Sequence, residues 1–306
     1  MDDNTHIVTP DEGQLARILE GTVHEWAGGL DFPRYAQVQR AVLGSPESAG
    51  RFRFRALVDE RRQVLCSLKA YRLAALWGGR AIPALGIGAV YTPPALRGRG
   101  FASALVRAVL DEERQGGARA ALLFSDIGAA FYRRLGFARV PTSVVDVPVG
   151  ALPEAPGARD IGFAELDQAA QVLAARPVGD AFAVARTVPT VRLLVARLSR
   201  TIEAHGVPTG PVGALAPRGA ALWVGFPGRG LTLLDLYAED DASRAALLAR
   251  ARAAAERLQC AKVSAWTVAG AAPFEGTRTR KTAVAMIAGI GADGPRRALL
   301  TGLDHF

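Results

Sequence analysis

The stretch VYTPPALRGRGFA, residues 90–102, decides the fold of this chain of 306 residues. It joins an apolar, strand-like run to the start of a long helical pattern. Gly98 and Gly100 let the backbone approach a ligand with no Cβ in the way. A helix N-terminus also presents unpaired N–H groups and the positive end of its dipole, and Arg97 and Arg99 add positive charge there. The stretch therefore predicts an anion-binding loop, although a tight strand-to-helix turn has the same composition.

The stretch does not fit the common nucleotide-binding loops. A Walker loop ends in Gly-Lys followed by Ser or Thr, and that ending is absent here. A dinucleotide fingerprint needs three spaced glycines near the start of a βαβ unit, with an acidic residue beyond it. The loop meets neither requirement, so a different phosphate-bearing ligand is expected.

Helical and strand-like patterns alternate around this loop. The first half predicts helices over about residues 11–19, 33–43, 100–115 and 129–135, and strands over about 52–58, 63–77, 80–91, 119–124 and 142–149. Gly78-Gly79 indicates a two-residue hairpin between two of the strands. Two helices, an antiparallel meander, a crossover helix and a further strand favour a mixed, mostly antiparallel α/β sheet over a doubly wound parallel one.

A linker rich in Pro, Gly and Ala, residues 150–158, divides the chain into residues 1–150 and 159–306. The second half predicts helices over about residues 164–175, 189–204 and 241–258, and strands over about 212–217, 220–226, 231–237 and 261–268. This order repeats that of the first half. The junction before its long helix reads LYAEDD, residues 236–241, and those acids would repel a phosphate. We therefore expect a second α/β domain without an anion site.

Composition narrows the class of protein. Hydrophobic residues make up 50% and charged residues 22%, as in ordinary globular chains. The net charge of +8 is spread along the chain without a basic run, so a nucleic-acid partner is not expected. Cys66 and Cys260 provide neither a metal-ligand spacing nor a disulfide framework. With no signal peptide and no apolar run of about 18 residues, we expect a cytoplasmic protein without a metal or a membrane partner; a homodimer is possible.

The loop resembles motif A of the GCN5-related N-acetyltransferases (GNAT), Val-x-Thr-x-Pro-x-x-Arg-Gly-x-Gly-x-Ala. The matching residues are Val90, Thr92, Pro94, Arg97, Gly98, Gly100 and Ala102. Farther on, FYRRLGF, residues 131–137, resembles motif B of the same family. The resemblance covers roughly residues 1–150. It implies a GNAT-type sheet in the first half, followed by a degenerate GNAT-like domain.

This resemblance implies an N-acetyltransferase with acetyl-CoA as its cosubstrate. The acetyl-CoA contacts that it implies are Val90, Tyr91, Thr92, Arg97, Gly98, Arg99, Gly100, Phe101, Ala102 and Ser125. The Val90 N–H would stabilise the developing oxyanion. Tyr132, with an ordinary pKa of about 10, would protonate the departing thiolate; alternatively its ring packs on the sheet and its hydroxyl binds the cofactor. Asp126 is a candidate base, or else a helix cap.

Further candidates for the base are His24 and Glu25, which fall between the first two predicted helices. His305 and the terminal carboxylate of Phe306 are another option. The tandem-domain enhanced intracellular survival acetyltransferases, which the chain resembles more distantly, place their C-terminal carboxylate in the active site. Most chain termini, however, have no such role.

The chain also resembles the fungal lysine N6-acetyltransferases and their bacterial relatives. The similar segments are LFSDIGAAFY (residues 123–132), WAGGL (residues 26–30), Tyr35, residues 192–197, residues 213–214, Trp223 and residues 263–266. This implies a small primary amine as acceptor, such as a free, lysine-like amino acid. A cationic acceptor would need an acidic pocket, for which Asp126, Glu25, Asp31 and Asp235 are candidates. A protein or peptide acetyltransferase and a non-catalytic CoA-binding sensor remain alternatives.

Overall fold

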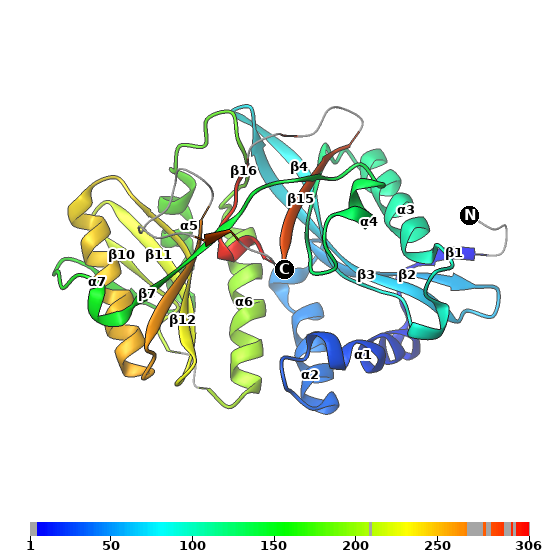
Figure 1. Cartoon of the computed structure of the whole chain (residues 1–306), viewed down its shortest axis with the longest axis horizontal. Helices are drawn as coiled ribbons and strands as arrows, with labels where there is room; N and C mark the ends of the chain where they lie inside the picture. Colours follow the sequence, from blue (N-terminus) through cyan, green and yellow to red (C-terminus); the bar gives the residue numbers. More distant parts are fainter. Residues whose placement is uncertain are drawn as a thin grey trace.

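Two twisted β-sheets stand side by side, with α6 running between them (Figure 1). The computed structural model describes residues 5–207, 210–267, 278–279, 283–290, 295 and 298–305. The first strand lies at the outer edge of one lobe, and the C-terminus lies at the centre, where the two lobes meet. This arrangement confirms the expected mixed, mostly antiparallel α/β class.

The first sheet has the strand order β1-β2-β3-β4-β5-β15-β6, with β9 pairing with β3 and β16 with β9. Its strands are β1 (Thr5–Val8), β2 (Phe52–Asp59), β3 (Val64–Trp77), β4 (Arg80–Tyr91), β5 (Ala120–Ser125), β6 (Ala138–Arg139), β9 (Phe182–Val184), β15 (Val284–Gly289) and β16 (Ala298–Leu299). Its helices are α1 (Glu12–Trp26), α2 (Phe32–Leu43), α3 (Phe101–Gln115) and α4 (Ala130–Arg133).

The second sheet has the order β14-β7-β13-β12-β11-β10-β8. Its strands are β7 (Ser143–Pro148), β8 (Arg159–Ile161), β10 (Gly213–Ala216), β11 (Gly219–Phe226), β12 (Gly230–Ala238), β13 (Lys262–Thr267) and β14 (Arg278–Thr279). Three helices accompany it: α5 (Leu166–Ala174), α6 (Val188–Ala204) and α7 (Asp241–Arg257). Short 3₁₀ turns complete the chain at Pro46–Ser48, Pro94–Leu96, Val149–Ala151, Phe163–Glu165 and Gly302–Asp304.

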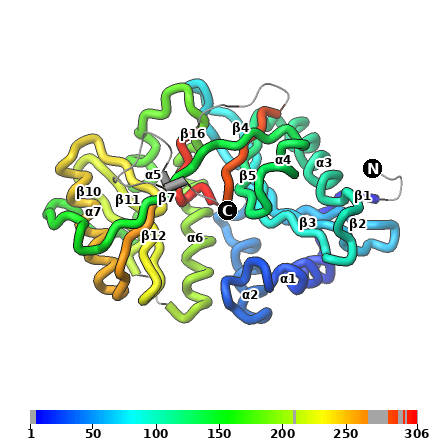
Figure 2. Tube along the Cα trace, in the orientation of Figure 1, coloured from blue at the N-terminus to red at the C-terminus, as the bar shows by residue number. Residues whose placement is uncertain are grey.

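The two sheets exchange strands. The strand expected over residues 142–149 exists as β7, but it pairs antiparallel with β13 in the second sheet. Conversely β15, near the end of the chain, pairs antiparallel with β5 in the first sheet. Figures 1 and 2 show the segment that ends in β7 passing from one lobe to the other. The sheets are thus interlocked, and the division into residues 1–150 and 159–306 stays a prediction about domains.

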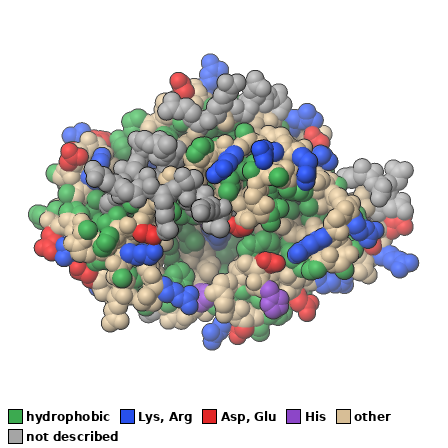
Figure 3. Space-filling view, viewed as in Figure 1, with side chains coloured by type: hydrophobic (Ala, Val, Ile, Leu, Met, Phe, Trp, Pro, Cys, Tyr) green, Lys and Arg blue, Asp and Glu red, His purple; other side chains and the backbone are tan. Residues whose placement is uncertain are grey.

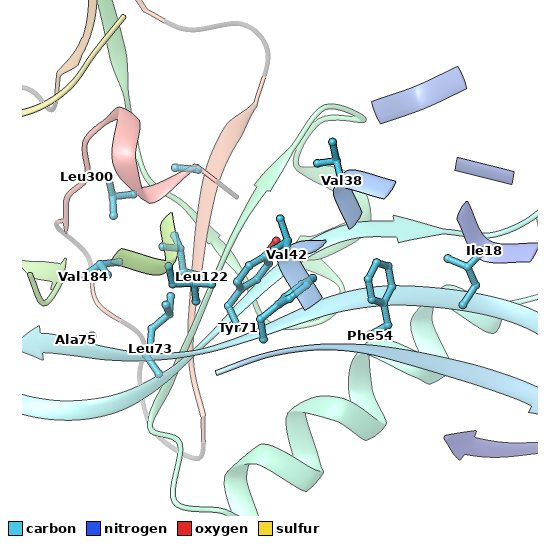
Figure 4. Close-up of a cluster of buried hydrophobic side chains, with 14 of the residues drawn as sticks. Ile18, Val38, Val42, Phe54, Tyr71, Leu73, Ala75, Leu122, Val184 and Leu300 are labelled. Atoms are coloured by element: carbon cyan, nitrogen blue, oxygen red, sulfur yellow. The ribbon is translucent and has the colours of Figure 1, made fainter. Parts of the chain in front are cut away.

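The core of the first lobe mixes residues from both halves of the chain. On the face covered by α1 and α2, Phe54, Tyr71 and Leu122 pack with Val184 and Leu300 (Figure 4). On the opposite face, α3 and α4 pack against the sheet through a second apolar cluster. The two faces of this sheet are thus covered by different helices and different apolar side chains.

Candidate active site

The candidate site begins where β4 and β5 part. The two strands are parallel neighbours over residues 84–87 and 120–123 only. Beyond that point β4 continues to Tyr91 and pairs with β3 alone. The β3–β4 register shifts between Ser67 and Lys69, and Ala89 takes a positive φ of 46°. This is the geometry of a β-bulge, which bends its strand and re-aims the residues that follow.

A cavity of about 580 Å³ lies at the end of β4, between the start of α3 and α4. The predicted cofactor-binding residues that line it are Val90, Tyr91, Thr92, Arg97, Gly98, Gly100, Phe101 and Ala102. Tyr132 lines it as well. Arg99, Ser125 and Asp126 are not among its lining residues. The sequence motif therefore forms one wall of a cavity.

The loop before α3 leaves the helix N-terminus open. Gly98 and Gly100 have φ values of 80° and 83°, a region that other residues enter only at a cost. No side chain caps α3, and a Cβ at either glycine would meet nothing within 4 Å. Arg97 Nε donates to the Thr92 carbonyl at 3.1 Å, and the Arg99 guanidinium lies 5.0 Å from the Phe101 ring centroid. The first-turn N–H groups are thus free of side-chain acceptors and face the cavity.

Tyr132 is held at the cavity by aromatic packing. Its ring meets Phe131 and Phe137 edge-on, with centroid distances of 4.8 and 6.0 Å. The side chain is 7% exposed. Burial first, and then the nearby Cys66 and Asp126, raise the pKa of Tyr132 to about 12. The hydroxyl therefore stays protonated at all physiological pH values and can act as a proton donor.

Cys66 is a neighbour of this site that the sequence did not single out for a role. It is buried on β3, and the Thr92 hydroxyl donates to its sulfur at 3.3 Å. Burial raises the pKa of the Cys66 thiol to about 11. A protonated, buried thiol is a poor nucleophile, so Cys66 contributes packing at the base of the site.

Ser125 and Asp126 serve the turn after β5. The Ser125 hydroxyl donates to the Gly128 carbonyl at 2.6 Å, and Asp126 Oδ1 accepts the Ala283 N–H at 2.9 Å. The alternative interpretation of Asp126 as a helix cap is wrong, because no side chain caps α4. Asp126 instead fixes the start of β15, whose position in the first sheet could not be foreseen.

The other candidate bases are in different surroundings. His24 and Glu25 lie in the last turn of α1 rather than between helices, since α1 extends to Trp26. Glu25 lines the cavity, and its Oε1 is 4.0 Å from an Arg97 nitrogen. His305 packs its ring on Phe124, at the end of β5, with a centroid distance of 5.1 Å. Phe306 lies outside the described residues.

Two of the acids expected to form a cationic pocket are engaged elsewhere. Asp31 is the N-cap of α2 and accepts the Arg34 N–H at 2.9 Å. Asp235 is buried in the second sheet, where Arg176 and Arg186 bind it. Burial opposes its charge, but these two guanidinium groups hold its pKa at about 2. Of the proposed acids, only Glu25 reaches the cavity.

Several cavity residues come from parts of the chain with no motif. Trp26 meets Tyr91 edge-on at 6.2 Å, and Ile127, 75% exposed, lies on the loop after β5. Both line the cavity, together with Arg134. Gly21 allows α1 to approach Tyr91 closely, because a Cβ at position 21 would lie 2.9 Å from the Tyr91 ring. Only the spatial approach of α1 and this loop to β4 reveals them.

Within the part of the chain that the structure describes, no group of His, Cys, Asp or Glu could hold a metal ion. Among the same residues, no helix combines the length and apolar character needed to cross a bilayer.

Residues 29–140, which include the splayed strands and the open helix N-terminus, match the family model of the acetyltransferase (GNAT) domain. This match identifies the protein as an acyltransferase. No curated protein sequence matches the chain. The matched segment includes both sequence motifs and every cavity-lining residue except Glu25 and Trp26, so residues 29–140 are the part of the chain that is similar to a GNAT acetyltransferase domain.

Solved structures share the fold at low sequence identity. A GCN5-related N-acetyltransferase from Kribbella flavida is 19% identical with a TM-score of 0.68, over 93% of this chain and 70% of that one. A probable N-acyltransferase from Enterococcus faecalis V583 is 12% identical with a TM-score of 0.70, over 94% and 72%. Eis1 from Mycobacterium abscessus is 15% identical with a TM-score of 0.59, over 94% and 73%. The expected likeness to the enhanced intracellular survival acetyltransferases is thus confirmed for the fold.

Proposed function

We propose that this protein transfers the acetyl group of acetyl-CoA to the primary amine of a small molecule. One observation carries the proposal: the uncapped N-terminus of α3, with Gly98 and Gly100, faces the same cavity as the protonated Tyr132. The open N–H groups fit a pyrophosphate. Arg97 and Arg99 supply the positive charge that a phosphate needs at such a site.

The end of β4 supports the next step. Val90 lies just after the bulge, where the strand no longer pairs with β5. In this proposal its backbone binds the pantetheine arm as an added strand would, and its N–H stabilises the oxyanion of the thioester carbonyl. The amine nitrogen forms a bond to that carbonyl carbon, and the carbon–sulfur bond breaks. Tyr132 gives its proton to the departing sulfur.

Two carboxylates are available for the proton of the amine. Glu25 lines the cavity, beside the ring of Trp26. Asp126 is exposed and lies close enough to Tyr132 to raise the pKa of its hydroxyl. We assign proton removal to Glu25, with Asp126 as the second candidate, because only Glu25 reaches the cavity. Replacing Glu25 by Gln should then lower the rate more than Asp126→Asn does.

The second half is proposed as a degenerate copy of the first. Its elements β10-β11-β12-α7-β13 follow the same order as β2-β3-β4-α3-β5, and β12 and β13 are parallel, as are β4 and β5.

The resemblance to the fungal lysine N6-acetyltransferases supports a free, lysine-like amino acid as the acceptor. A protein or peptide acceptor is the alternative, with the second half as a docking platform.

An acetyl-CoA consumption assay across free amino acids, polyamines, aminoglycosides and peptides tests the proposal. Turnover with at least one small amine is expected. Tight CoA binding without turnover of any acceptor would instead identify a CoA sensor. Turnover confined to peptides would identify the protein acetyltransferase alternative.

A further inference from the structure

The last turn of α1 forms a second wall of the cavity, apart from the phosphate loop. Glu25 and Trp26 line the cavity from this turn, and they precede the segment, residues 29–140, that matches the GNAT domain. The Trp26 ring meets the Tyr91 ring edge-on, with a centroid distance of 6.2 Å. At Gly21 a Cβ would lie 2.9 Å from the Tyr91 ring. The end of α1 and the end of β4 therefore form one continuous surface.

This α1 wall lies on the opposite face of the first sheet from α3 and α4. Ile18 of α1 packs in the apolar cluster on one face. Val90 of β4 and Tyr132 of α4 belong to the cluster on the other face. Tyr91 points to α1 instead, because successive side chains of a strand point to opposite faces. In the proposed transfer CoA enters along α3, which leaves the α1 wall to the acceptor.

The cavity carries large apolar side chains that are open to solvent. Trp26 is 38% exposed, and Ile127 on the loop after β5 is 75% exposed. Phe32, at the start of α2, is 39% exposed but is not among the residues that line the cavity. Figure 3 shows hydrophobic side chains at the surface of this lobe between α4 and α1, with Lys and Arg side chains around them. Because covering exposed apolar surface is favourable, a ligand that reaches Trp26 and Ile127 gains affinity through an apolar group.

We propose that the acceptor is a primary amine on an apolar stem, an alkyl or arylalkyl chain, which packs against Trp26 and Ile127. The inference rests on the proposed acetyl transfer and names the substrate class of the same site. The amine nitrogen attacks the thioester carbon, its proton passes to Glu25, and the departing sulfur takes the Tyr132 proton. The stem then lies against the indole, because Glu25 and Trp26 line the same cavity.

The indole face selects against polar stems. A polar atom in the stem would lose its water without gaining a hydrogen bond from the ring. An apolar stem loses nothing there and covers Trp26. The side-chain stem of a lysine-like amino acid belongs to the favoured class.

Two amines of equal length that differ in one stem atom provide the test. Butylamine has a methylene group where 2-methoxyethylamine has an ether oxygen. Their rates are compared at equal concentrations of the neutral amine, because the two amines differ in basicity. The kcat/KM for butylamine should be about tenfold higher, the discrimination that one methylene brings in an apolar site. Calorimetry of both amines with the CoA-loaded protein gives a readout that does not depend on turnover, and butylamine should bind more tightly there as well.

Variants of the two exposed side chains locate the preference. Trp26→Ser and Ile127→Ser replace apolar contacts by small polar groups, and each should reduce the preference for butylamine to about twofold. Trp26→Phe keeps an aromatic face and should retain most of it. Phe32→Ser is the matched control and should keep the full preference, because Phe32 is as exposed as Trp26 but does not line the cavity. CoA affinity should stay at the wild-type value in all four variants, since the phosphate loop is unchanged.

Equal kcat/KM values and affinities for the two amines would overturn the apolar subsite and leave acetyl transfer intact. A preference that persists when Trp26→Ser and Ile127→Ser are combined would do the same. Loss of CoA affinity in Trp26→Ser with an unchanged preference would assign the indole to the cofactor, and this too would overturn the inference. So would a CoA-loaded protein that binds neither amine. Tighter binding of butylamine without acetylation of any amine would instead support the subsite and contradict acetyl transfer.

Discussion

The junctions from β4 to α3 and from β12 to α7 connect equivalent elements in opposite ways. Before α3, glycines with positive φ replace any side-chain cap. Before α7, the Asp240 carboxylate accepts the Ser243 N–H at 2.6 Å, and Glu239 pairs with Arg218 at 2.6 Å. A helix N-terminus binds an external anion only while its N–H groups are unclaimed. At the second junction, a carboxylate from the chain already binds one of these N–H groups.

The gaps between the parallel strands differ in the same way. Beyond residue 87, β4 leaves β5 and a cavity opens. Beyond Leu233, β12 likewise stops pairing with β13, but Asp235 there is bound by Arg176 and Arg186. Arg186 also binds Asp304 at 2.5 Å, which ties the end of the chain into this gap. One architecture is thus kept open for a ligand in the first lobe and filled with ion pairs in the second.

Closing the first junction should have the largest effect. Gly100→Glu forces a side chain into a left-handed backbone conformation and places a carboxylate at the open N–H groups. Strain and charge repulsion together should weaken CoA binding roughly 1000-fold, or about 4 kcal/mol. Calorimetric titration with CoA measures the change. An affinity equal to that of the wild type would show that this loop is not the phosphate site.

We expect acetyl transfer, like acetyl-CoA binding, to depend on residues of the first lobe. Tyr132→Phe removes the proposed proton donor and keeps the ring packing, so kcat should fall about 100-fold. The KM for acetyl-CoA should change little. Tyr35→Phe is the control, since Tyr35 is also buried but hydrogen-bonds Thr22 away from the cavity. Steady-state rates that fall equally in both variants would exclude a specific role for Tyr132.

Opening the second junction should cost stability without changing function. Asp240→Ala removes the N-cap of α7 and should lower the free energy of unfolding by about 1 kcal/mol. CoA affinity should be unchanged, because α7 faces no phosphate site. Urea denaturation and CoA titration of the same variant check both parts. A change in CoA affinity would contradict the assignment of binding to the first lobe alone.

The raised pKa of Tyr132, about 12, predicts the smallest effect. A proton donor is active below its pKa, so Tyr132 should remain active from pH 7 to pH 10. With a fully neutral amine as acceptor, kcat should vary less than about twofold over that range. A kcat–pH profile tests this. An alkaline decline below pH 10 that disappears in Tyr132→Phe would show a lower pKa in the working enzyme.

The sequence predicts the wall of the site better than its surroundings. Residues 90–102 are contiguous, and their pattern of Gly, Arg and Pro indicates the local backbone geometry. The sequence therefore predicts the positions of the loop and of the start of α3 to within a residue or two. The residue pattern of a strand does not indicate which sheet the strand joins. The sequence therefore predicts β7 in the sheet of the first lobe. Short strands such as β9 and β16 have too few residues for a period to show.

The remaining site residues depend on tertiary contacts. Glu25 and Trp26 reach the cavity because α1 extends past its expected end and packs Gly21 against Tyr91. Such pairings across the fold are invisible to a periodicity analysis.

The number of acetyl-CoA molecules bound per chain tests the central claim most directly. Titration calorimetry should give one site in the wild-type protein and in Asp240→Ala, and no measurable site in Gly100→Glu. Two equivalents in the wild type, or one equivalent that survives Gly100→Glu, would contradict a single acetyl-CoA site at the start of α3.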